Sequence, residues 1–125
     1  LVLCCQAHNV GVIPWGPLAG GFLTGKYRQG EKSPEDGRLS KPNALYSGVL
    51  NEANWSKLAK LEAFASERGH TVGELAIAWL LSKPYVSTVI AGAKKAEQVL
   101  ANIAAGKWKL TAEEAAKADD ITAGK

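Results

Sequence analysis

A glycine-rich loop directly follows a short apolar run near the beginning of the chain. The run, residues 10–14, is rich in β-branched side chains, and the loop carries three glycines and a proline between positions 16 and 21. Ligands of parallel α/β proteins bind where strands end in such loops, because the backbone there is open to them. Trp15 lies at this strand end, where its ring either stacks on a flat ligand or forms part of the rim of the sheet.

A second loop of the same character follows the apolar run at residues 86–90. Gly92 lets the backbone approach an anion, and Lys94 and Lys95 add positive charge. The helix expected at residues 96–105 directs its first N–H groups at the same place. These features suit a phosphate group, and they suit equally well a simple strand-to-helix turn with two solvated lysines.

Three other features are weaker indications of a functional site. The segment GGFLTGK at residues 20–26 approaches the phosphate-binding loop of nucleotide triphosphatases, but Tyr27 stands where Ser or Thr must hold Mg²⁺. His8 and His70 have no Cys, Asp or Glu at metal-ligand spacing, which favours capping or solvent-exposed roles. Asn102 either satisfies the core or reaches a ligand from beneath the second loop.

The composition is that of an ordinary globular domain. Of the 125 residues, 46% are hydrophobic and 22% charged, and the net charge of +3 is spread among acidic neighbours, a field too weak and mixed for nucleic acid. No apolar stretch approaches the roughly 18 residues of a membrane-spanning helix. Cys4 and Cys5 are adjacent, which excludes a CxxC metal or redox pair and favours a reduced, cytoplasmic setting.

Helix-forming patterns dominate the second half of the chain. A helix with one apolar face is expected to begin at Asn54, its cap, and to end at residues 68–69. Capping boxes at residues 71–74 and 111–114 open two further helices. The first of these is apolar nearly all round, which predicts burial on several sides, and Pro84 closes it.

The remaining elements complete an alternating pattern of strands and helices. Residues 1–8 suit the end of a helix, and residues 26–47 suit a long polar loop. Strands that alternate with helices predict an α/β fold in which residues 10–14 and 86–90 pair in parallel. The helix at residues 96–105 is expected to turn three apolar side chains inward, those of Val99, Leu100 and Ile103.

Two parallel strands do not make a complete sheet, because their outer edges and apolar faces lack partners. A complete (β/α)8 barrel takes roughly 250 residues. The chain is therefore expected either to form part of a larger domain or to complete itself by association.

Four segments resemble the carboxyl-terminal part of the aldo-keto reductases. They are GVIPWGPLAGGFLTGKY at residues 11–27, TVGELAIAWLLSKP at 71–84, STVIAGAKKAEQVLANI at 87–103 and WKLTAEE at 108–114. The LTGKY loop and the GAxxxEQxxxN motif are most similar to the branch that includes bacterial reductases and the potassium-channel β subunits. The resemblance implies that residues 1–125 are a C-terminal fragment of one barrel domain: the last two βα units and the C-terminal helices of a (β/α)8 TIM barrel.

The resemblance also implies an NADP cofactor and a small-molecule carbonyl substrate. Members of the family bind NADPH across the carboxyl rim of the barrel and reduce aldehydes and ketones by hydride transfer. Trp15 matches the aromatic residue that stacks on the nicotinamide, and Arg38 matches the arginine that folds over the pyrophosphate. The pyrophosphate loop is matched by Gly16, Pro17, Leu18, Gly20, Leu23 and Lys26, and the adenosine end by Gly92, Lys94, Gln98 and Asn102. Lys94 favours NADP over NAD, because a second phosphate needs a nearby cation.

Two departures from the family and one gap bear on activity. Gly16 stands where the family has Ser, and Ala101 stands where it has an acidic residue, which predicts weaker cofactor binding. The catalytic Asp, Tyr, Lys and His of the family match no residue of this chain. We therefore expect a chain that supplies cofactor contacts and is inactive alone. The alternative is a non-catalytic module that binds NADP or associates with itself.

Overall fold

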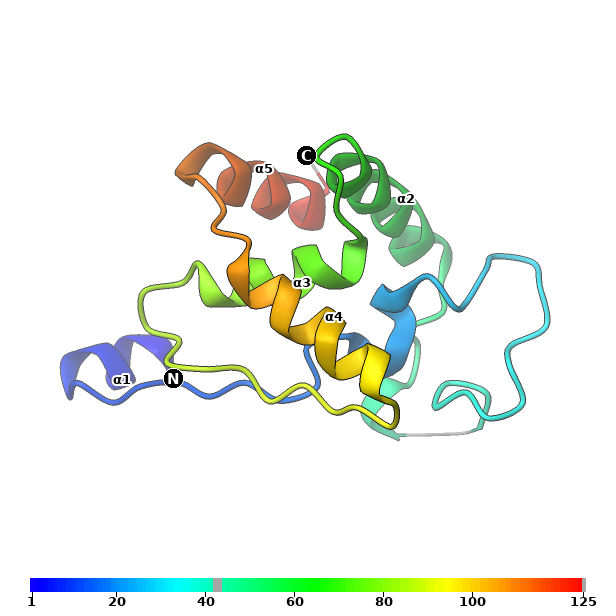
Figure 1. The fold of residues 1–125 in the computed structure, drawn as a ribbon, viewed down its shortest axis with the longest axis horizontal. Helices are drawn as coiled ribbons and strands as arrows, with labels where there is room; N and C mark the ends of the chain where they lie inside the picture. The colour runs from blue at the N-terminus through cyan, green and yellow to red at the C-terminus, as the bar shows by residue number, and fades with distance from the viewer. Residues whose placement is uncertain (42–43, 125) are drawn as a thin grey trace.

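The computed structural model describes residues 1–41 and 44–124, in which helices predominate. The elements in chain order are α1 (Val2–Ala7), η1 (Ala19–Thr24), η2 (Ala44–Tyr46), α2 (Glu52–Ser66), α3 (Val72–Leu81), α4 (Ala96–Lys107) and α5 (Ala112–Ala123), where η marks a 3₁₀-helix. Helix α3 lies at the centre and contacts α2, α4 and η1, whereas α1 lies apart at one end of the molecule (Figure 1).

Two extended segments, 10–15 and 85–90, run side by side below these helices (Figure 1). The Val12 N–H donates to the Tyr85 carbonyl at 2.8 Å, and the Ser87 N–H donates back to the Val12 carbonyl at 3.0 Å. The parallel bridges are Val12 with Val86 and Trp15 with Ile90. The predicted parallel pairing is therefore confirmed.

Pro14 interrupts this pairing. A regular parallel ladder would next use the N–H of residue 14, which proline lacks, so the register shifts. The two bridges are separated by three residue steps from Val12 to Trp15 and by four from Val86 to Ile90, which places one extra residue on the second segment. The continuous strands expected at residues 10–14 and 86–90 are consequently replaced by two isolated bridges.

The hydrophobic core lies between α2, α3, α5 and η1. Its buried members are Phe22, Leu58, Leu61, Phe64, Ala65, Val72, Leu75 and Ile121. Phe22 is 5% exposed and meets Trp55 of α2 edge to face, with ring centroids 4.9 Å apart. Since Phe22 lies within η1, the core holds the glycine-rich loop directly.

Helix α2 begins three residues earlier than the sequence predicted. Asn51, not Asn54, is the cap: its Oδ1 accepts the Asn54 N–H at 2.9 Å. The Asn54 side chain donates instead to the Val49 carbonyl at 2.9 Å. The prediction of Asn54 was wrong because two asparagines precede the apolar face, and only the path of the incoming chain decides which one caps.

Both predicted capping boxes are present, and side chains join them. The Thr71 N–H donates to Glu74 at 2.7 Å, and the Thr111 N–H donates to Glu114 at 2.9 Å. Arg68 Nε donates to Glu114 at 3.0 Å, which links the turn before α3 to the first turn of α5. The adjacent His70 ring stacks on Trp108, with centroids 3.9 Å apart and planes inclined by 9°.

Helix α4 does not turn its apolar side chains inward as expected. Val99, Leu100 and Ile103 are all exposed, and α4 instead packs on α3 through the buried Ala105. The expectation was wrong because the helix offers two candidate faces, and its small residues allow a closer approach to α3. Val99 and Ile103 line an open hollow between α3 and α4, and Leu100 is the most exposed of the three.

We predict that Glu74 makes stability dependent on pH. Burial alone would raise the pKa of Glu74, but hydrogen bonds from Thr71 and the charge of His70 lower it below its ordinary value of 4.5. The ionised carboxylate therefore stabilises the fold above that value, and this contribution is lost as the pH falls below it. Thermal unfolding followed by circular dichroism should show a weaker acid destabilisation for Glu74→Gln than for the wild type. Glu97→Gln, an exposed carboxylate of α4, serves as the control, and an unchanged pH profile for Glu74→Gln would contradict the prediction.

Candidate functional site

The Trp15–Ile90 bridge brings the two candidate loops to one edge of the molecule. The Ile90 N–H donates to the Pro14 carbonyl at 2.9 Å, so both segments end their pairing at the same level. The glycine-rich loop leaves this edge after Trp15, and the Gly92 loop leaves it after Ile90. Two loops that lie 70 residues or more apart in the sequence thus leave the same end of the paired segments.

The glycine-rich loop is folded back on itself and fixed. Gly20 and Gly21 have φ values of +68° and +98°, which L side chains rarely adopt. The Gly21 and Leu23 N–H groups donate to the Leu18 carbonyl at 2.8 and 3.2 Å. Leu18 and Leu23 are half-buried, so these two predicted cofactor residues contribute mainly to seating the loop.

Lys26 lies across the same loop. A Cβ at Gly21 would come within 2.5 Å of Lys26 Cε, and Lys26 Nζ lies 5.1 Å from the centroid of the Tyr27 ring. The Lys26 residue itself is exposed. The structure therefore places a cation directly against Gly21, where its positive charge suits an anionic ligand.

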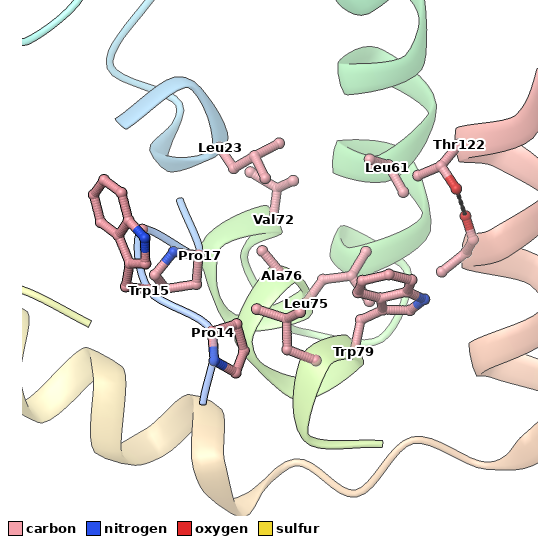
Figure 2. Close-up of a pocket in the computed structure, with 13 residues that line it drawn as sticks. Pro14, Trp15, Pro17, Leu23, Leu61, Val72, Leu75, Ala76, Trp79 and Thr122 are labelled. Carbon is pink, nitrogen blue, oxygen red and sulfur yellow. Dashed lines mark hydrogen bonds between the residues drawn. The ribbon is translucent and has the colours of Figure 1, made fainter. Parts of the chain in front are cut away.

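Trp15 stands at the mouth of an apolar cavity. Its residue is 61% exposed, and it lies on one side of the cavity with Trp79 on the other (Figure 2). The cavity has a volume of about 320 Å³ and is also lined by Pro14, Pro17 and Leu75. An exposed indole beside a proline-bounded loop is suited to stacking on a flat ring.

The polar groups beside Trp79 form hydrogen bonds with one another. Trp79 Nε1 donates to Asp119 at 2.7 Å, and Lys83 Nζ donates to both Asp119 oxygens at 3.1 and 3.0 Å. The hydrogen bonds from Lys83, followed by that from Trp79, hold the pKa of Asp119 below its usual range in spite of some desolvation. This carboxylate therefore pairs α3 with α5 and is not a candidate for proton transfer.

The second loop caps α4 with the side chain that the sequence assigned to adenosine. Gln98 Oε1 accepts the Lys94 and Lys95 N–H groups at 2.7 and 3.3 Å. Gln98 thereby fixes the backbone that carries Lys94, an exposed residue. At Gly92 no atom lies within 4 Å of where a Cβ would stand, so the space next to it is open. Asn102, one turn further along α4, is half-buried and lines a hollow between α3 and α4.

Leu39 and Tyr46 belong to the site, although sequence reasoning missed both. A Cβ at Gly20 would lie 2.9 Å from Leu39 Cδ2 and 3.1 Å from Tyr46 Cδ2, and a Cβ at Gly16 would lie 3.2 Å from Tyr46 Oη. The long loop thus rests on the glycine-rich loop and brings the exposed Arg38 with it. No local pattern identifies these two residues, because their contacts depend on how the loop returns.

The donor set of this edge suits an anionic dinucleotide. It combines an exposed aromatic ring, the open backbone at Gly92, the cations Lys26, Arg38 and Lys94, and the N-terminus of α4. Among the described residues, no group of three or more His, Cys, Asp or Glu could hold a metal ion. Nor is any helix of this part of the chain long and apolar enough to cross a membrane.

Comparison with known proteins identifies the class. Residues 1–123 match the model of the Aldo/keto reductase family, and the chain belongs to this family. It is 38% identical over 122 residues to a putative voltage-gated potassium channel subunit beta of Schizosaccharomyces pombe, covering 93% of this chain and 35% of the relative. It is 40% identical over 104 residues to an L-glyceraldehyde 3-phosphate reductase of Escherichia coli O157:H7, covering 80% and 30%. The resemblance inferred from the sequence is confirmed.

A solved structure has the same fold over nearly the whole chain. The glycerol dehydrogenase of Gluconobacter oxydans superposes with a TM-score of 0.79 at 29% identity, covering 99% of this chain and 37% of that one. The chain therefore spans about a third of the length of these relatives.

We predict that Gly20→Ala destabilises the chain more than Gly30→Ala. Both glycines have positive φ, +68° and +78°, so both variants carry a similar backbone penalty of about 1 kcal/mol. Only at Gly20 does the added Cβ meet Leu39 and Tyr46; at Gly30 it meets nothing within 4 Å. Urea unfolding should show the larger loss for Gly20→Ala. Equal losses would mean that the long loop does not rest on Gly20.

Proposed function

We propose that this chain forms the NADP-binding edge of a cytoplasmic reductase that acts on aldehydes and ketones by hydride transfer. In this proposal residues 1–125 are the last two βα units and the C-terminal helices of a (β/α)8 barrel. The observation that carries it is the Trp15–Ile90 bridge, because it brings the two loops with the predicted cofactor residues to one edge. Relatives named as a reductase and a dehydrogenase support the reaction class.

Three groups of residues bind three parts of the extended cofactor. Trp15 stacks on the nicotinamide, from which the bound cofactor supplies a hydride. Lys26 and Arg38 hold the pyrophosphate against the glycine-rich loop through their positive charge. Lys94 takes the phosphate of the adenosine, and Gln98 acts through Lys94 by holding its N–H.

The same proposal makes the chain inactive by itself. The reaction needs a proton donor at the carbonyl oxygen, and the catalytic residues that supply it in the family match no residue of this chain. Tyr27 is buried and its hydroxyl accepts the Leu39 N–H at 3.0 Å. The His70 ring is stacked on Trp108. The chain therefore holds the cofactor, and the acid-base groups of the family come from other segments.

Titration with NADPH, followed by its fluorescence, tests the cofactor assignment. Trp15→Ala should weaken binding about two- to twelvefold, since an aromatic stack contributes roughly 0.5–1.5 kcal/mol. Trp15→Phe keeps a flat ring and should retain most of the affinity. Lys94→Ala should weaken binding of NADPH but not of NADH, because only NADPH carries the extra phosphate.

Lys60→Ala, which removes an exposed lysine of α2, is the matched control for charge. An unchanged affinity in Trp15→Ala would remove this residue from the site. A wild-type chain that does not bind NADPH at all would overturn the proposed function.

A second candidate function is self-association into a larger assembly. It is favoured by the exposure of Ile13, Ile90 and Leu100, which are 53%, 57% and 66% exposed. Apolar surface of this kind is commonly buried against a partner. A second copy of the chain, or the other half of a barrel, offers such a partner.

Sedimentation velocity and an activity assay separate the two candidates. If the chain only binds the cofactor, it should sediment as a monomer and show no NADPH oxidation with a nitrobenzaldehyde. Self-association predicts a concentration-dependent dimer or larger species, which Leu100→Glu should dissociate because it places a charge in the interface. Family-like turnover by the monomer would contradict the assignment of the catalytic groups to other segments.

A further inference from the structure

The side chain of Tyr27 connects the glycine-rich loop to the segment that carries Arg38. Tyr27 follows Lys26 directly, yet its residue is only 2% exposed. Its hydroxyl accepts the Leu39 N–H at 3.0 Å across 12 residues of chain. A hydrogen bond of this kind fixes the backbone next to Arg38 rather than the Arg38 side chain itself.

The segment that Tyr27 holds is a pair of consecutive turns. The Gly37 N–H donates to the Pro34 carbonyl at 2.8 Å, and the Ser40 N–H donates to the Gly37 carbonyl at 3.1 Å. The Ser40 hydroxyl also donates to the Pro34 carbonyl. Arg38 therefore projects from a locally braced backbone and not from a freely moving loop.

Gly37 is the residue that allows this approach. It is buried, and a Cβ at this position would lie 2.7 Å from Tyr27 Oη. Any larger residue would push the turns away from the hydroxyl. On the other side, Leu39 rests on Gly20, so the Arg38 segment is held between Tyr27 and the glycine-rich loop.

We propose that Tyr27 is a positioning residue that acts through Arg38: its hydroxyl holds the 34–40 turns over the glycine-rich loop, where the Arg38 guanidinium meets the phosphates of the cofactor. The phosphate role of Arg38 rests on the proposed function, whereas the bracing of the turns rests on the contacts above. Tyr27→Phe separates the hydroxyl from the ring, because phenylalanine keeps the buried packing and loses only the acceptor for the Leu39 N–H.

Limited trypsin digestion without any ligand tests the bracing. Tyr27→Phe should accelerate cleavage after Arg38 roughly three- to tenfold, since cleavage follows local opening of the turns. Tyr85→Phe, a matched loss of a hydroxyl at the far end of the paired segments, should leave this rate unchanged. An unchanged rate in Tyr27→Phe would overturn the proposal.

A double-mutant cycle with NADPH tests whether Tyr27 acts through Arg38. Tyr27→Phe should weaken NADPH binding about threefold in the wild-type background and have no further effect in Arg38→Ala. Equal losses in both backgrounds, or no loss in either, would overturn the positioning role. If the wild-type chain does not bind NADPH, the proposed function fails, and the trypsin result alone decides whether Tyr27 holds the segment.

Discussion

The missing N–H of Pro14 is the constraint on which the site depends. It ends the regular pairing after Val12, and the extra residue on the partner segment then brings Ile90 level with Trp15. Both segments turn into loops immediately beyond this bridge. A continuous ladder would have used these backbone groups for hydrogen bonds within the sheet, whereas the interruption leaves the adjoining loops to face a ligand.

Burial of Phe22 fixes the position of the glycine-rich loop at this edge. The ring is fixed among the core residues of α2 and α3, so the glycine-rich loop is attached to the helices at its centre. Leu39 and Tyr46 close over its outer side at Gly20. A loop held on both sides loses little conformational entropy when it binds, which favours affinity without requiring a large contact area.

Local chemistry was predictable from the sequence, and long-range packing was not. The capping boxes at Thr71 and Thr111 and the motifs of the family follow from residues close together in the chain. The parallel direction of the pairing follows from the order of strands and helices, which needs no knowledge of side-chain contacts. The cap at Asn51 depends on how the preceding loop arrives. The packing of Tyr46 on Gly20 joins residues 26 positions apart through an irregular segment, where no periodicity indicates which side chain returns.

Helix α4 is held in place by its packing on α3 and by a cap in its first turn. The helical cluster has its own core, and α4 packs on α3 with Ala105 buried while Leu100 stays exposed. Its first turn is fixed separately by Gln98, which accepts the Lys94 N–H. The first turn of α4 is thus ordered by its own cap, while the Leu100 side chain further along the helix remains exposed. The cap of α4 and its exposed apolar side chain are therefore different residues, so a substitution at Leu100 leaves undisturbed the backbone that carries Lys94.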